Sequence, residues 1–171
     1  EEIHKNSHMA NHPSIINYLN IQETLDKTTL ENRWQSEDPQ MLSHNPASQL
    51  LQSFLEEDTH ANNATQALYI TDNQGLLSAS INFSPQYLNR SRPAWNKAIG
   101  GGKDFAYIGP LEKDPKTGDF LFEIAVPIRS NNIVKGVLHR VYWAKNFFSS
   151  WIETIQFGST GHVMLIASDG T

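Results

Sequence analysis

The most constraining feature of the sequence is a long apolar hairpin pattern. The segments "FLFEIAVPI" (120–128) and "IVKGVLHRVYW" (133–143) are rich in β-branched and aromatic residues, and the short polar stretch "SNN" (130–132) lies between them. Two strands joined by so short a turn pair in antiparallel fashion. The sequence therefore predicts two long neighbouring strands in an antiparallel sheet.

The middle of the chain predicts three more strands. "ALYIT" (67–71) leads into the turn "DNQG" and returns through "LLSASI" (76–81). "DFAYIG" (104–109) is a further strand, and "KDPKTGD" (113–119) supplies Pro and Gly for the turn that precedes the long hairpin. These segments complete a five-stranded antiparallel sheet.

Helical patterns fill most of the first sixty residues. Apolar residues recur at imperfect helical spacing from Ser14 to about Trp34. A second helix is predicted to begin at Pro46, because Asn45 is a favoured N-cap residue and proline is favoured at the first helical position. We therefore expect a long N-terminal helix followed by a shorter one.

Two further helices are predicted within and after the sheet, over residues 92–99 and 146–155. Helices combined with an antiparallel sheet make an α+β domain. Two strands, a helical excursion across one face and then three strands form a PAS-like arrangement. Such a sheet leaves a cavity between its face and the excursion, where a small ligand can bind.

Composition excludes several classes of function. The 171 residues carry a net charge of −5, and the 13 Lys and Arg residues are scattered, so no basic stripe follows a nucleic-acid backbone or an anionic membrane. The sequence contains no Cys, which excludes disulfides and thiolate zinc sites. It also lacks a run of about 18 apolar residues of the kind that spans a membrane.

Several motifs, in their order and spacing, resemble the double-Cache (dCache) sensor modules of bacterial transmembrane receptors. They are "YITDNQGLLSAS", "RSRPAWNKAIGG", "DPKTGDFLFEIAVPI" and "VKGVLHRVYW". The ending "IQFGSTGHVMLIASDGT" is similar to the linker and first strand of a second module, and "GHVML" is most similar to the sensory part of histidine kinases. The resemblance covers residues 14–171.

The resemblance implies a domain organisation. Residues 1–60 are the N-terminal helical segment, residues 61–145 the membrane-distal PAS-like Cache module, and residues 146–171 a linker helix and the first strand of an incomplete membrane-proximal module. The sequence begins without an initiator Met, so we expect it to be a piece of a longer protein. The family further implies a periplasmic location, flanking transmembrane helices and a homodimer.

The function implied is the sensing of a small molecule by a bacterial histidine kinase of a two-component system. Ligand in the distal module would alter the packing of the N-terminal helix and signal across the membrane. The same module on a methyl-accepting chemoreceptor or a diguanylate cyclase, or a ligand-free dimerising spacer, remains an alternative. No nucleophile or acid–base set marks an enzyme, and no cofactor motif is present.

Candidate ligand-binding residues follow from the family's motifs. Arg92 matches the helix arginine, whose guanidinium suits bidentate carboxylate binding. Trp95 can form a wall beside it, and Tyr107 corresponds to a pocket tyrosine of the amino-acid-binding subgroup. The alternatives are a solvated surface position for Arg92, core packing for Trp95 and an ordinary sheet aromatic for Tyr107.

The long strands supply three more candidates. Glu123 interrupts an apolar strand and must be paired, either by a structural salt bridge or by a ligand cation. On the last strand, alternation places His139 on one face and Arg140 on the other. The family's ligand-binding Asp or Lys is replaced by Val141, so a standard α-amino acid is disfavoured, and we expect a carboxylate or other small anion. His139 can instead be a satisfied core histidine.

A metal site is not predicted. His4, His8 and His12 recur at intervals of four, which on one helix face can bind a metal ion. Pro13 disfavours helical geometry at His12, and the three residues are therefore not assigned to a metal.

Overall fold

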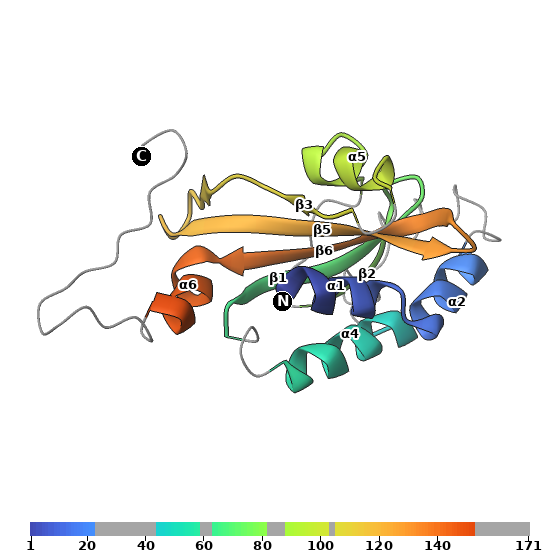
Figure 1. Cartoon of the computed structure of the whole chain (residues 1–171), viewed down its shortest axis with the longest axis horizontal. Coiled ribbons are helices and arrows are strands. Elements are labelled where there is room, and N and C mark those ends of the chain that lie inside the picture. Colours follow the sequence, from blue (N-terminus) through green and yellow to red (C-terminus); the bar gives the residue numbers. More distant parts are fainter. Residues whose placement is uncertain (23–43, 59–62, 82–87, 103–104, 153–171) are drawn as a thin grey trace, which may run out of the picture.

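The computed structural model of the chain describes residues 1–22, 44–58, 63–81, 88–102 and 105–152. Helices and an antiparallel sheet alternate through this part of the chain (Figure 1). The helices are α1 (Glu2–Ala10), α2 (Pro13–Gln22), α4 (Pro46–Glu57), α5 (Pro93–Ile99) and α6 (Ala144–Ile152). The strands are β1 (Thr65–Asp72), β2 (Leu77–Ile81), β3 (Tyr107–Ile108), β4 (Glu112–Lys113), β5 (Phe120–Ser130) and β6 (Ile133–Trp143).

The predicted α+β fold with a PAS-like sheet is confirmed. The strands follow the order β2-β1-β6-β5-β3, and each neighbouring pair is antiparallel. β5 and β6 form the long hairpin through the Asn131–Asn132 turn, where both residues have positive φ angles of 49° and 66°. The described residues form six strands rather than five, because the two-residue strand β4 also pairs with the start of β5.

The two faces of the sheet are covered by different helices. Helices α1, α2 and α4 lie on one face and α5 lies on the other (Figure 1). The predicted alternation on β6 is confirmed, since Leu138 belongs to the core beneath the first three helices, whereas Val137 packs against α5. Each face therefore has its own apolar core and its own polar residues.

The start of α4 matches the prediction. Asn45 is the N-cap, its side-chain oxygen accepts a 2.9 Å hydrogen bond from the backbone N–H of Ser48, and Pro46 occupies the first turn. Helix α2 begins at Pro13, next to the predicted helix start at Ser14. Helix α1 is an additional helix that precedes it and ends at Ala10, because proline lacks the N–H that would continue one helix through this point.

A buried charged cluster fixes α1 and α4 to the sheet. Arg140 is fully buried and donates hydrogen bonds to Thr65 (2.9 Å) and to the Asp58 carboxylate (3.0 Å). Lys5 of α1 reaches the other Asp58 oxygen at 3.1 Å, and it also pairs with Glu2 at 3.0 Å. Burial opposes ionisation of Asp58, but Arg140 and Lys5 hold its pKa below the ordinary value.

Several predictions fall outside the described residues. They are the continuation of the N-terminal helix to Trp34, the end of the helix predicted over 146–155, and the terminal segment assigned to a second module. Helix α6 covers the first part of the 146–155 prediction. None of the described helices is long and apolar enough to cross a membrane.

Candidate functional site

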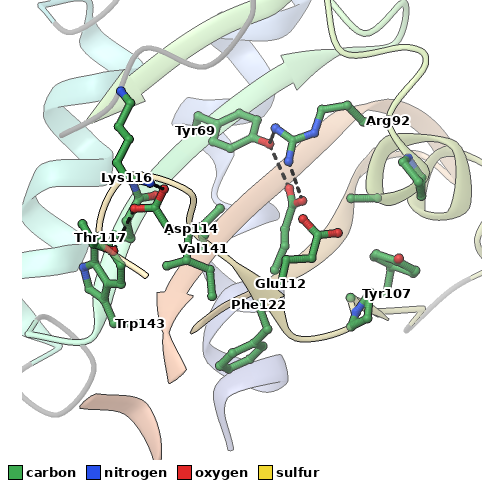
Figure 2. Close-up of a pocket in the computed structure, with 17 residues that line it drawn as sticks. Tyr69, Arg92, Tyr107, Glu112, Asp114, Lys116, Thr117, Phe122, Val141 and Trp143 are labelled. Carbon is green, nitrogen blue, oxygen red and sulfur yellow. Dashed lines mark hydrogen bonds and ion pairs between the residues drawn. The ribbon is translucent and has the colours of Figure 1, made fainter. Parts of the chain in front are cut away.

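A pocket of about 650 Å³ opens on the α5 face of the sheet. Its walls come from β1, β5, β6, the start of α5 and the segment between β3 and β5 (Figure 2). Figure 2 shows the Arg92 guanidinium meeting the Tyr69 hydroxyl, while Asp114 and Trp143 lie away from Arg92. The pocket lies where the sequence predicts a cavity, between the sheet and the helical excursion.

Arg92 is placed by the start of α5. It is the N-cap residue with an extended backbone, and Pro93 follows in the first turn. Its guanidinium reaches down to the sheet, where Nη1 donates to the Tyr69 hydroxyl (2.9 Å) and Nη2 to Oε2 of Glu123 (3.1 Å). The Arg92 side chain is 36% exposed and that of Glu123 is 12% exposed, so the pair spans the pocket wall.

Glu123 is the centre of the hydrogen-bond network. Its Oε1 accepts from the Tyr69 hydroxyl at 2.8 Å and lies 2.8 Å from Nδ1 of His139. Because a carboxylate only accepts, Nδ1 of His139 carries the proton. Of the two alternatives given for Glu123, the structural salt bridge is present. Its partner is Arg92, another candidate ligand-binding residue.

His139 lies beneath the pocket and is fully buried. Its ring stacks on that of Tyr69, with centroids 4.5 Å apart and planes 2° apart. Its Nε2 lies 3.2 Å from the Thr71 hydroxyl. With Nδ1 protonated toward Glu123, Nε2 of the neutral ring accepts from Thr71, and both ring nitrogens are satisfied.

The electrostatics give one consistent protonation pattern. Burial lowers the pKa of His139 below its ordinary value and outweighs the opposing effect of Glu123, so the ring is neutral at pH 7. Burial alone would raise the pKa of Glu123, but hydrogen bonds from His139 and Tyr69 and the positive charge of Arg92 lower it. Burial and Glu123 raise the pKa of Tyr69 well above its usual value.

The site keeps donors that a ligand can use. A guanidinium has five N–H donors, and Tyr69 and Glu123 engage only two of those of Arg92 among the described residues. Glu123 thus orients Arg92 and leaves other N–H donors of the guanidinium available to a ligand. Further charges lining the pocket come from Glu112, Asp114 and Lys116, and apolar walls come from Val141 and Trp143.

The six predicted site residues are distributed over three environments. Arg92, Glu123 and His139 join in one network, and Tyr107 lines the same pocket. Trp95 donates to the backbone oxygen of Asp72 (3.3 Å) and packs with Ala98 and Val137, which is the core role weighed for it.

Arg140 lies on the opposite face of the sheet from the pocket. Neighbouring residues in a strand point to opposite faces, so His139 and Arg140 cannot both enter the pocket. Arg140 instead joins α4 through Asp58. Arg140, named above as a candidate ligand-binding residue, therefore does not line the pocket and instead holds the helices to the sheet.

Tyr69 is the main site residue that the sequence pattern does not predict. The pattern "ALYIT" reads as an apolar strand, and a tyrosine within it is ordinary. Its hydroxyl nonetheless bridges Arg92 and Glu123. The signal that could have found it is register: Tyr69 is paired with His139 across β1 and β6, so both residues face the same side.

A metal centre is not assigned. The described residues contain no group of three His, Asp or Glu side chains arranged to hold a metal ion. His8 and His12 instead pack edge-on against the ring of Phe54.

The chain is similar to several solved sensor domains. The ligand-binding domain of the Pseudomonas fluorescens chemoreceptor CtaA, in complex with L-serine, is 20% identical with a TM-score of 0.49, and the match covers 92% of this chain and 70% of that one. The corresponding domain of the Pseudomonas aeruginosa PAO1 amino acid chemoreceptor PctC, in complex with GABA, is 15% identical with a TM-score of 0.48. That match covers 85% of this chain and 61% of the PctC domain. The extracellular domain of the putative histidine kinase rpHK1S-Z16 is 16% identical with a TM-score of 0.45, and the match covers 91% of this chain and 61% of that one. No family model and no curated protein matches the sequence.

Proposed function

We propose that this chain is the ligand-binding sensor module of a bacterial membrane receptor and that it binds a small molecule in the pocket on the α5 face. The observation that carries the proposal is the pocket itself, with the oriented Arg92 guanidinium at its wall. The dCache-like motifs supply the receptor context.

The ligand that fits the site is a carboxylate or a zwitterion. The remaining Arg92 donors suit a carboxylate, because guanidinium and carboxylate match in bidentate geometry. Tyr107 and Val141 provide apolar surface for the body of the molecule. Asp114 and Lys116 lie away from Arg92 and can meet a second polar group (Figure 2).

The proposed signal is a shift in population between two arrangements of the sheet and the N-terminal helices. The "GHVML" motif favours a histidine kinase as the output. A chemoreceptor or a diguanylate cyclase is the alternative output, and the protein sequence on either side of this segment distinguishes them. Transmembrane spans flanking the module and a periplasmic location belong to the same proposal.

A thermal-shift screen of organic acids, amino acids and amines tests the binding function. A ligand at about 100-fold excess over its Kd stabilises the folded state by about 2.7 kcal/mol. Arg92→Ala should abolish the shift given by a carboxylate. Arg90→Ala is the matched control, because Arg90 lies two residues away, is exposed and does not line the pocket.

Two outcomes would contradict the proposal. An unchanged shift in Arg92→Ala would show that the ligand does not use Arg92. The absence of a shift with every compound in the screen would favour the ligand-free dimerising spacer.

A further inference from the structure

The pocket wall contains a charge arrangement that cannot stay unchanged when an anion binds. In the described structure, Arg92 balances the largely buried carboxylate of Glu123 at 3.1 Å. A bound carboxylate would share the same guanidinium. Two anions would then compete for one cation, and Glu123 would lose part of its compensation in a largely buried position.

The nearest group that can restore the balance is His139. It is neutral, fully buried and already hydrogen-bonded to Glu123 at 2.8 Å. Proton uptake would convert this contact into an ion pair within the sheet. The Thr71 hydroxyl, 3.2 Å from Nε2, can rotate and accept from the protonated ring, and it then donates to the Val137 carbonyl at 3.5 Å. Both protonation states therefore have hydrogen-bond partners.

The groups facing His139 are few and their effects oppose one another. From β5, Glu123 favours the protonated ring, and from the start of α5, Arg92 disfavours it. From β1, Tyr69 stacks on the ring and Thr71 bonds to it. On β6 itself, the neighbouring Arg140 points to the other face. Beyond this shell, Glu112 of β4 acts on Arg92.

We propose that Glu123 and His139 act as one proton-accepting unit beneath the pocket, so that an anion bound to Arg92 is taken up together with a proton. This inference rests on the proposed binding function and adds its regulation. Affinity for a carboxylate rises as the pH falls, by up to about tenfold per pH unit, where the ring is neutral in the free protein and protonated in the complex. By linkage, bound carboxylate raises the pKa of His139 to the same extent.

The first experiment needs no ligand. Arg92→Gln removes the charge that a bound anion would neutralise, so it should move the titration midpoint of His139 to higher pH. Two-bond ¹H–¹⁵N correlation spectra of the imidazole ring report the midpoint, and His139→Gln assigns the signals. Arg92→Lys keeps the positive charge and should titrate near the wild type. Arg90→Gln makes the same charge change away from the network and should have no effect.

The second experiment uses acetate as the probe, at tens of millimolar, with the wild-type chain between about pH 8 and about pH 5. This range extends below the ordinary histidine pKa of about 6.5 because the pKa of His139 is lowered. Acetate should shift the backbone signals around the pocket, raise the midpoint of His139 and bind more tightly as the pH falls. Calorimetry in two buffers with different ionisation enthalpies should report proton uptake.

The outcomes separate this inference from the proposed function. Acetate binding with no pH dependence, or equal His139 midpoints in the wild type and Arg92→Gln, would overturn the proton coupling and leave the binding function intact. A higher midpoint in Arg92→Gln without any acetate binding would support the proton-accepting unit and count against a carboxylate ligand.

Discussion

At the scale of single residues, the site depends on groups that fix one another. The Tyr69 hydroxyl donates to Glu123 and accepts from Arg92, while its ring covers His139. Each of these polar groups is satisfied by another member of the network, and removal of one leaves its partners unpaired in a buried place. Glu123 was predictable as a paired carboxylate because charge in an apolar strand needs compensation. The identity of its partners was not, because they come from three distant segments.

Tyr69→Phe tests the bridging hydroxyl. We expect the free energy of unfolding to fall by about 2 kcal/mol, because the hydrogen bonds lost involve charged groups. Urea unfolding measures the change. Tyr107→Phe is the control, since Tyr107 lines the same pocket outside the Arg92–Glu123–His139 network, and it should change stability by less than about 0.5 kcal/mol. Equal effects of the two substitutions would contradict the role of Tyr69.

The lowered pKa of His139 predicts how stability depends on pH. In the unfolded chain a histidine takes up a proton below about pH 6.5, whereas the buried ring resists it. The stability contributed by the neutral ring is therefore present above about pH 6.5 and is lost as the pH falls toward the folded-state pKa. His139→Gln should remove this part of the slope, as measured by urea unfolding at a series of pH values. A slope identical to that of the wild type would show that His139 does not titrate on unfolding.

At the scale of elements, β6 carries polar residues of both faces. His139 points to the pocket and Arg140, the next residue, points to the helices. The sequence predicted this division from alternation alone, because strand periodicity is a local property. It could not predict that Arg140 would meet Asp58, since that contact depends on how α4 docks, 82 residues earlier in the chain.

The two cations that bind Asp58 should differ in their effect on stability. Arg140→Met should lower the free energy of unfolding by about 3 kcal/mol, because it leaves a largely buried carboxylate without its buried partner. Lys5→Met should cost less than about 1 kcal/mol, because the Lys5 side chain is 31% exposed and such pairs are screened by solvent. Neither change should alter ligand affinity in protein that remains folded. Chemical unfolding and a binding titration of both variants measure these effects. A larger loss of unfolding free energy for Lys5→Met than for Arg140→Met would contradict the dominant role of Arg140 in binding Asp58.

At the scale of the whole molecule, the two faces of the sheet have different roles. Helix α5 lies on one face, and α1, α2 and α4 lie on the other (Figure 1). The α5 face carries the pocket, and the other face holds the N-terminal helices through a core and the Arg140 cluster. The fold class was predictable because the hairpin, the caps and the turns are encoded in short stretches. The charge pattern of the pocket was less predictable from the sequence. The segment between β3 and β5 supplies Glu112, Asp114 and Lys116, and their placement depends on two very short strands.

Ligand binding in the pocket on the α5 face is tested most directly by mapping where a ligand binds on the sheet. The compound with the largest Arg92-dependent thermal shift is titrated into ¹⁵N-labelled protein, and the amide chemical shifts are followed. We expect the largest changes on the pocket face, at Tyr69, Tyr107 and the amides around Arg92. The largest changes on α1, α4 or the face of Arg140, with the pocket amides unmoved, would contradict binding in the pocket.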